Sequence, residues 1–240
     1  MSNEWNLLIT GETDPIFNMA VEDAIASRVG KGVVPPTLRI WKDKSCFVIG
    51  RFGHRRFVEQ IKRVKREGFL VVERQSGGEA IYHDEGCVNL SVFVPRPYNE
   101  QNWNRVEDAF KHLSAGLIRG LKYLGIPSMQ SRVETFCPGP YDLAVNGKKI
   151  AGLSMARRKN FVLLQGTLIV NSDLNHYFDV LTKFYGELEV DKITSLEKEI
   201  GKKIKETDLI EAIVRGYEEV FHIKFISNEP IQNSAFISRM

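Results

Sequence analysis

Short apolar runs alternate along this chain with longer segments whose apolar residues recur at helical spacing. Compact or alternating apolar runs favour β-strands, whereas apolar residues three and four positions apart favour a helix with one buried face. The expected strands cover residues 5–9, 37–41, 46–49, 69–73, 88–94, 143–145, 149–151 and 161–170, and the expected helices cover 18–29, 57–67, 103–124 and most of 171–221. Strands and helices in this order, with several hairpins, predict an α+β fold in which helices flank a mixed central β-sheet, not a doubly wound sheet.

Turn-forming residues mark the ends of several of these elements. Gly68 follows an expected helix, in the position that a helix C-terminus favours. Asn146-Gly147 separates two short strands, and Asn-Gly is a strong hairpin signal because both central positions of such a turn need positive φ. Side chains alternate across a strand, so Lys148 and Lys149 must point to opposite faces, and we expect one of them to face inward.

The composition limits the classes of partner and the compartment. The 240 residues are 43% hydrophobic and carry a formal net charge of +3, with the charges well mixed. Such a chain buries a core without disulfides or metal, and it has no basic block of the kind that binds nucleic acid. No apolar run approaches the roughly 18 residues that cross a membrane, and the start lacks a secretory signal pattern. We therefore expect a cytoplasmic protein without nucleic-acid or membrane partners, whose mild basicity suits an acidic protein partner.

The three cysteines have different surroundings. Cys46 and Cys87 lie in apolar, strand-like runs, which is typical of small buried residues. Cys137 begins a Cys-Pro-Gly-Pro stretch that predicts a loop, because proline removes a donor and glycine loosens the chain. An accessible loop thiolate is the reactive kind, although a lone cysteine is commonly only a buried residue. The odd number and wide spacing do not indicate a disulfide framework.

Two further stretches carry residues suited to chemistry. One runs from Arg74 through Ser76, Gly77 and Gly78 to Gly86, and its paired glycines let main-chain N–H groups approach a carbonyl or phosphate oxygen. We expect Arg74 to supply positive charge at its edge, although an ordinary hairpin turn explains the glycines equally well.

The other stretch surrounds Lys149, which begins an apolar strand. Its apolar neighbours would hold the lysine stem while the ammonium faces a cleft. The alternative is a solvated loop, which is the usual setting of two adjacent lysines beside a hairpin turn.

Together and in this order, residues 74–84 and 142–152 resemble the motifs of the lipoate–biotin ligase and transferase superfamily. Its members carry Arg-x-[Ser/Thr]-Gly-Gly, often ending in Tyr-His-Asp, followed by Asp-Leu-x-x-x-Gly-Lys-Lys-x-x-Gly. The resemblance spans about residues 15–220 and implies a biotin/lipoate ligase catalytic-domain fold over 1–226, a loose tail over 227–240, and an acyl tunnel between the two motif segments. The positions it implies for substrate binding are Arg74, Ser76, Gly77, Gly78, Tyr82, His83, Asn89, Asp142, Gly152 and Ser154.

Within the superfamily, residues 136–143 and 147–152 resemble the octanoyl amidotransferases. In that family the cysteine matching Cys137 is the acylated nucleophile, and the lysine matching Lys149 favours its thiolate form. The resemblance implies octanoyl or lipoyl transfer from the octanoylated glycine-cleavage H protein to a lysine of the lipoyl domains of 2-oxoacid dehydrogenase E2 subunits. It implies no cofactor and no metal.

Three alternatives remain open at the level of sequence. An ATP-dependent lipoate–protein ligase would need ATP and Mg²⁺; the Tyr82-His83-Asp84 segment is closer to that group. Against it, Glu79 replaces a third glycine and would place a carboxylate near an adenylate phosphate, and the chain ends too soon for the accessory domain of many ligases. A transferase that takes octanoyl from an acyl-carrier protein also uses a cysteine followed by a lysine. A carrier-binding module without turnover is the third alternative.

Overall fold

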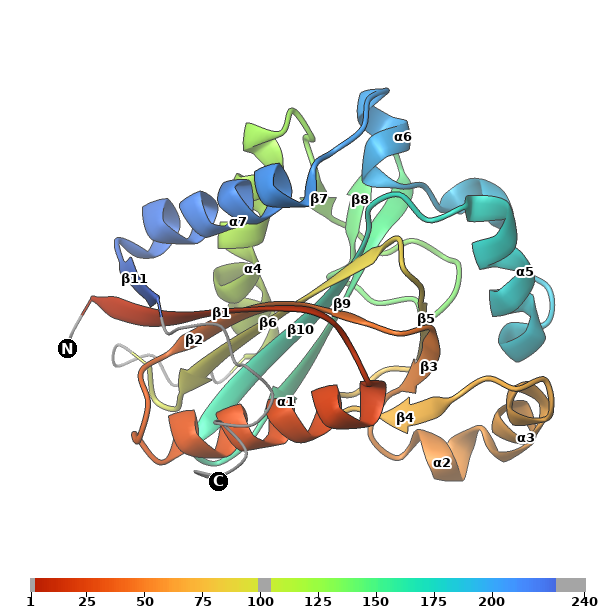
Figure 1. Ribbon diagram of the computed structural model, residues 1–240, viewed down its shortest axis with the longest axis horizontal. Coiled ribbons are helices and arrows are strands. Elements are labelled where there is room, and N and C mark those ends of the chain that lie inside the picture. Colours follow the sequence, from red (N-terminus) through yellow and green to blue (C-terminus); the bar gives the residue numbers. More distant parts are fainter. Residues whose placement is uncertain (1–2, 99–104, 228–240) are drawn as a thin grey trace.

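The computed structural model, which describes residues 3–98 and 105–227, has a large mixed β-sheet with helices on both faces (Figure 1). Its strand order is β11-β1-β2-β6-β10-β9-β8-β7, with β11, β1 and β2 parallel and the other neighbours antiparallel. The strands are β1 (Glu4–Thr13), β2 (Thr37–Asp43), β6 (Cys87–Pro95), β7 (Met129–Gln130), β8 (Leu143–Val145), β9 (Lys148–Arg157), β10 (Phe161–Ile169) and β11 (Lys224–Ser227). The predicted α+β class and mixed sheet are confirmed.

Side-chain alternation in the central strands builds a separate core on each face of this sheet. Val92 and Val94 of β6 face the helix pair α4 (Val106–Tyr123) and α7 (Glu206–Phe221), whereas Phe93 faces α1 (Pro15–Gly30). The side chain of Asp14 accepts hydrogen bonds from two main-chain N–H groups of the first turn of α1, which is the usual role of an N-cap aspartate. Apolar residues on alternate sides of buried strands therefore fix which helix covers which face.

A second, three-stranded sheet was not predicted as a separate unit. It has the order β4-β3-β5, formed by β3 (Cys46–Ile49), β4 (Val71–Glu73) and β5 (Ala80–His83). The chain passes from β2 to β3 through two residues and from β5 to β6 through three, so the small sheet is joined to the large one at two places. The helices beside the second sheet are α2 (Gly53–Arg56), α3 (Val58–Arg66) and α5 (Leu174–Tyr185); η1 (Val190–Lys192) and α6 (Leu196–Ile200) lead on to α7.

Several element boundaries differ from the sequence prediction. The helix predicted over 57–67 is confirmed as α3, but a further short helix, α2, precedes it, and the chain turns at Phe57 between the two. Ser227, predicted to begin a loose tail, ends the strand β11, while residues 228–240 and the first two residues of the predicted helix 103–124 lie outside the described residues. The hairpin prediction is confirmed, since Asn146 and Gly147 have φ values of 50° and 75°. Within the described residues, no helix has the length and apolar character needed to cross a membrane.

Three glycines let α4 and α7 pack directly against each other. A Cβ atom at Gly216 would lie 2.3 Å from the carbonyl oxygen of Gly116 and 2.5 Å from the main-chain nitrogen of Gly120. Backbone atoms cannot move aside like the end of a flexible side chain, so these positions require glycine for this close crossing.

We expect Gly216→Ala to lower the free energy of unfolding by about 1–3 kcal/mol, the usual range for overpacking a well-packed contact. Gly11→Ala is the matched control, because a Cβ atom there meets nothing within 4 Å. Urea unfolding followed by circular dichroism measures both. Equal stabilities for the two variants would contradict the close-packed helix crossing.

Candidate active site

A pocket lies between the two sheets, where the small sheet separates from the large one. Its apolar wall includes Trp41, Val48, Ile81 and Leu153, contributed by β2, β3, β5 and β9. Eight predicted site residues also line it, namely Arg74, His83, Asn89, Cys137, Asp142, Lys149, Gly152 and Ser154. The two motif segments, far apart in sequence, therefore meet at one largely apolar pocket.

Cys137 lies in the loop between β7 and β8 at the point where the motif segments meet. Its thiol is partly exposed, unlike those of Cys46 and Cys87, whose burial raises their pKa values and keeps them neutral. The main-chain N–H of Glu79 points at the Cys137 Sγ, with a nitrogen-to-sulfur distance of 3.1 Å. This hydrogen bond fixes the position of the sulfur beside the glycine turn.

The conformation of Cys137 is unusual for a residue with a side chain. Its φ is 43°, in the left-handed region that favours glycine. Such strain persists only where surrounding contacts hold it, and it concentrates at functional sites.

Lys149 holds the Cys137 loop by its main chain. The lysine is fully buried, and its Nζ donates to the carbonyl oxygens of Phe136 and Cys137, both at 3.1 Å. The same Nζ lies 2.8 Å from Asp142 Oδ2 and 4.4 Å from the centre of the Phe136 ring. The prediction that one of the two lysines faces inward is confirmed, and the inward one is Lys149.

Asp142 closes this arrangement as the partner of Lys149. Its carboxylate also accepts hydrogen bonds from the main-chain N–H groups of Gly139 (3.0 Å) and Leu153 (3.1 Å). Burial raises the pKa of Asp142, while the Lys149 ammonium and the two N–H groups oppose that rise. The buried charge of Lys149 is therefore balanced by Asp142, and the pair anchors both ends of the loop that carries the thiol.

Arg74 and Ser76 act on the glycine turn itself. The Arg74 guanidinium donates to the carbonyl oxygens of Val48 (2.9 Å) and Gly77 (2.8 Å), and to Ser76 Oγ (3.1 Å). Ser76 is buried, and its hydroxyl also donates to Gln165 Oε1 (2.5 Å) and lies 2.8 Å from Ser154 Oγ. These contacts position the main chain of the turn beside Cys137.

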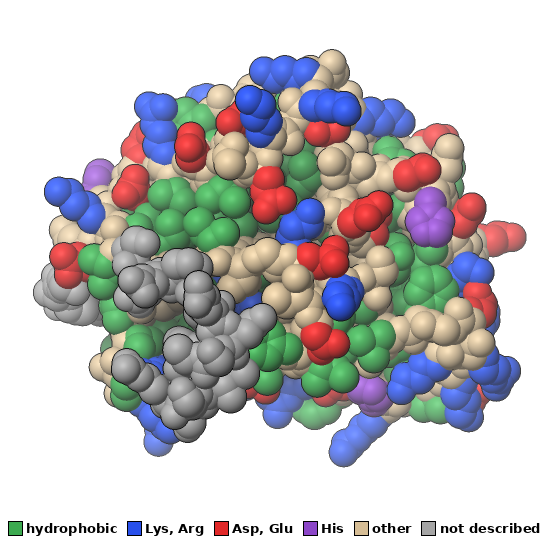
Figure 2. All heavy atoms as spheres, in the orientation of Figure 1, with side chains coloured by type: hydrophobic (Ala, Val, Ile, Leu, Met, Phe, Trp, Pro, Cys, Tyr) green, Lys and Arg blue, Asp and Glu red, His purple; other side chains and the backbone are tan. Residues whose placement is uncertain are grey.

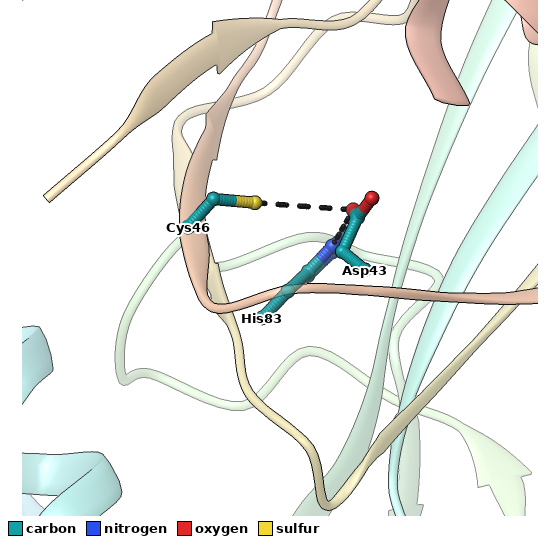
Figure 3. A group of neighbouring side chains, drawn as sticks. All are labelled: Asp43, Cys46 and His83. Carbon is teal, nitrogen blue, oxygen red and sulfur yellow. Dashed lines mark hydrogen bonds and ion pairs between the residues drawn. The ribbon is translucent and has the colours of Figure 1, made fainter. Parts of the chain in front are cut away.

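His83 lies deeper in the pocket within a polar cluster. Its Nδ1 is 2.7 Å from Asp43 Oδ2 and its Nε2 is 2.9 Å from Thr167 Oγ1. Asp43, Cys46 and His83 offer donor atoms within 4.8 Å of one another (Figure 3). The Cys46 thiol donates to Asp43 Oδ2 at 3.9 Å, and the same oxygen contacts His83 Nδ1, so this hydrogen-bonded chain orients the His83 ring.

Of the other predicted site residues, Gly78 borders the thiol, Gly77 precedes it in the same turn, and Tyr82 does not approach the thiol. A Cβ atom at Gly78 would lie 3.4 Å from the Cys137 Sγ. Tyr82 is buried on the other side of β5, with its ring 5.4 Å from that of Phe47 and 5.6 Å from that of Tyr177. Alternation along β5 explains the difference, since Tyr82 and His83 must face opposite ways.

The sequence prediction did not include three polar residues of the site. Gln165 and Thr167 line the pocket, and they stand out as two polar side chains on one face of the otherwise apolar strand β10. The Tyr185 hydroxyl bonds to both the N–H (3.0 Å) and the carbonyl (2.5 Å) of Ala80, beside the glycine turn. Burial, with the nearby Cys137 as a further cause, raises the pKa of Tyr185, which stays a neutral phenol. Tyr185 gave no sequence signal, because it comes from a distant helix.

Comparison with known proteins identifies the family of the chain. The family described as the lipoyl protein ligase A/B catalytic domain matches residues 14–218. The octanoyltransferase LipM of Staphylococcus aureus is 28% identical, covering 93% of this chain and 89% of the relative. The octanoyl-[GcvH]:protein N-octanoyltransferase of Lysinibacillus sphaericus is 29% identical, covering 73% and 63%. A lipoate-bound structure described as a putative lipoate protein ligase from T. acidophilum superposes with a TM-score of 0.77 at 22% identity, covering 98% and 93%, which supports the fold.

The chain belongs to the lipoyl protein ligase A/B catalytic-domain family. The relatives named above are octanoyltransferases, and the chain is an acyltransferase. The biotin/lipoate ligase fold implied by the motifs is confirmed.

Replacing Lys149 tests the anchor. We expect Lys149→Met to lower the free energy of unfolding by about 3–5 kcal/mol near neutral pH, because it leaves the Asp142 carboxylate buried without its partner. Linkage sets the sign of the pH dependence, because folding raises the pKa of the Asp142 carboxyl. Such a group costs no stability below its unfolded pKa, and the cost grows as the pH rises from the unfolded to the folded pKa. The deficit of the variant should therefore shrink on acidification below neutral pH.

Lys148→Met is the control, because Lys148 is only half-buried and points to the other face of β9. Denaturant unfolding between pH 5 and pH 8 makes the comparison. A Lys149→Met deficit that is small, or that does not change with pH, would contradict the buried pair as the anchor of the loop.

Proposed function

We propose that this acyltransferase moves an octanoyl or lipoyl group through a thioester on Cys137. The donor is the octanoylated glycine-cleavage H protein, and the acceptor is a lysine of an E2 lipoyl domain. The observation that carries the proposal is the Cys137 Sγ, partly exposed at the pocket and 3.1 Å from the Glu79 nitrogen. We place the reaction in the cytoplasm, whose reducing conditions keep such a thiol free.

The reaction consists of two acyl transfers. The Cys137 thiolate attacks the carbonyl carbon of the octanoyl-lysine amide, the C–N bond breaks, and the donor lysine leaves as an amine after taking up a proton. The acceptor lysine amine then attacks the thioester, the C–S bond breaks, and the thiolate returns with release of a proton. A good nucleophile thereby divides one difficult substitution into two easier ones.

The tetrahedral intermediates need donors for their oxyanion, and the glycine turn is the best placed candidate. Among the described residues, no acceptor takes the N–H groups of Gly77 and Gly78, and Gly78 borders the thiol. The main-chain N–H groups of residues 152–154 also lie at the pocket, but they are less suitable donors because Asp142 already takes the N–H of Leu153. One such donor is worth about 2.7–4 kcal/mol in other acyl-transfer sites.

Two alternative functions differ from this proposal in the source of the acyl group. An octanoyl-acyl-carrier protein would use the same thiol, so it changes the substrate and leaves the chemistry intact. An ATP-dependent ligase would bypass the thioester. The carboxylate of Glu79, expected to repel an adenylate phosphate, is paired with Arg56 at 2.9 Å, so its charge is partly compensated and weighs less against ATP than the sequence suggests. The position of Cys137 favours the transferase over the ligase.

We expect Cys137 to gain one octanoyl group when the enzyme meets the octanoylated H protein without ATP, because its thiolate attacks the donor amide. Intact mass spectrometry after brief incubation detects the adduct, which hydroxylamine should remove and Cys137→Ser should lack. Cys46→Ser is the control, since that thiol is buried and neutral.

Labelling by octanoyl-acyl-carrier protein alone would change the donor and keep the mechanism. Modification of the acceptor only when ATP and free octanoate are added would contradict the proposal and identify a ligase.

The role of the Glu79 N–H can be tested by a substitution that removes this main-chain donor. We expect Glu79→Pro, which removes that donor, to slow thioester formation by about 10²–10³-fold, the usual loss for one well-placed donor. Glu79→Ala keeps the N–H and separates the role of the main chain from that of the side chain. Acylation reactions quenched at intervals and analysed by mass spectrometry give both rates, and circular dichroism verifies that both variants fold. Equal rates for the two folded variants would show that the contact with sulfur is incidental.

A further inference from the structure

An exposed segment rich in arginine lies directly behind the glycine turn. We call residues 51–56 the arginine turn; it includes α2 and ends before the buried Phe57. Arg51, Phe52, Arg55 and Arg56 are all exposed, and Phe52 keeps 58% of its surface open to solvent. An exposed aromatic ring surrounded by guanidinium groups has the composition of an interface centre, since aromatic residues and arginine are enriched there.

The arginine turn is one layer of main chain away from the nucleophile. The Arg51 N–H donates to the Ser76 carbonyl at 2.8 Å, and the Gly50 N–H donates to the Glu79 carbonyl at 2.9 Å. The two backbones approach so closely that a Cβ atom at Gly50 would lie 2.3 Å from the Gly78 carbonyl oxygen. Because the N–H of Glu79 contacts the Cys137 Sγ from the same turn, a partner bound at the arginine turn lies close to the nucleophile.

The arginine turn is held in a strained conformation. Phe52 has a φ of 71°, in the left-handed region, where a residue with a side chain loses about 1–3 kcal/mol. The Glu73 carboxylate fixes it, 2.9 Å from the His54 Nδ1 and hydrogen-bonded to the main chain of Phe52 and His54. The side chain of Arg51 stacks over the Phe52 ring at 4.8 Å. These contacts present the ring to solvent, which folding alone does not require.

The arginine charges of this surface are only partly paired with carboxylates, since Arg56 pairs with Glu79. Among the described residues, neither Arg51 nor Arg55 forms an ion pair with a carboxylate. Arg158 joins them from the end of β9, with its guanidinium donating to the Gln75 carbonyl at 2.9 Å. Arg51 and Arg158 line one pocket, and burial followed by repulsion from Arg51 lowers the pKa of Arg158. In Figure 2, lysine and arginine side chains gather along the lower right edge, where Figure 1 has α2 and α3.

We infer that the arginine turn and Arg158 form the docking surface for the carrier domain, an acidic domain whose acyl-lysine passes Gly77 and Gly78 to reach Cys137. Phe52 supplies the apolar contact, and Arg51, Arg55 and Arg158 supply complementary charge that guides the encounter. This inference rests on the proposed function, because it assumes that the acyl group arrives on a protein lysine. Complementary charge raises association rates and fixes orientation more than it raises affinity, so its effect falls on kcat/KM for the carrier.

The test compares a protein donor with a small one. Acylation of Cys137 is measured with octanoylated H protein and with octanoyl-N-acetylcysteamine, a small thioester that needs no docking surface. The carrier-to-thioester ratio is kcat/KM for the H protein divided by kcat/KM for the small thioester. It should fall about tenfold or more in Arg51→Glu/Arg55→Glu at low ionic strength, because the new carboxylates repel an acidic carrier. The difference should shrink as salt screens the charges over a Debye length of about 8–10 Å.

Lys202→Glu/Lys203→Glu is the matched control, with the same change of charge on exposed residues after α6; in Figure 1, α6 lies at the upper edge and α2 at the lower edge. Its ratio should stay within about twofold of the wild type if the effect is local, since surface charge changes elsewhere have small effects. An equal fall in both double variants, or no fall in either, would overturn the docking surface.

Phe52→Gly gives an independent measurement. Glycine accepts the positive φ without strain, so we expect the free energy of unfolding to stay the same or rise, while the carrier-to-thioester ratio falls. A folded variant with an unchanged ratio would overturn the role of the ring. If wild-type Cys137 is acylated by neither donor, the proposed function fails. If it is acylated by both donors and the ratio is unchanged by the substitutions in the arginine turn, only the docking inference fails.

Discussion

The buried ion pair between Lys149 and Asp142 is the interaction on which the site depends. Lys149 binds the carbonyl oxygen of Cys137 itself, and Asp142 binds the main chain of Gly139 and Leu153, so one pair fixes the thiol loop to both β9 and its own far end. A buried charge is tolerated only with such complete partners. Lys149 therefore positions the nucleophile through the main-chain carbonyl of Cys137. The positive charge of Lys149 is balanced by the Asp142 carboxylate.

The opposite wall of the site is held by hydrogen bonds. Arg74 and Ser76 bond to neighbouring main chain and side chains and so fix the glycine turn, from which the Glu79 N–H points at the thiol. The second sheet makes this possible, because it separates from the main sheet and opens the pocket between them. A site assembled from two rigid walls has little to reorganise when charge develops on the substrate carbonyl, which is the usual source of electrostatic catalysis.

Local pattern predicted much of the fold, and its failures have physical reasons. The Asn146-Gly147 hairpin and the inward Lys149 follow from turn geometry and strand alternation, and both are confirmed. The small sheet was missed as a unit because pairing of β3, β4 and β5 depends on contacts distant in sequence. β11 was missed because a four-residue edge strand carries a weak signal.

In the site too, features set by local sequence could be predicted, and features set by contacts between distant segments could not. The pocket gathers the motif residues around Cys137, but Tyr82 lies on the far face of β5, where simple alternation places it. Asp142 was expected to bind substrate, whereas its oxygens meet Lys149 and two main-chain N–H groups, and that pairing depends on the register of β8 and β9. Tyr185 comes from α5, so only the tertiary structure brings it beside the glycine turn.

The central claim is that acyl-Cys137 is the species that delivers the acyl group, and a single-turnover chase tests it most directly. The octanoylated enzyme is freed of donor, mixed with an excess of acceptor lipoyl domain, and quenched at intervals for intact mass spectrometry. The account predicts that octanoyl passes from Cys137 to the acceptor lysine without ATP, at a rate no slower than steady-state turnover. Transfer slower than turnover, or transfer that requires donor to be present at the same time, would contradict it.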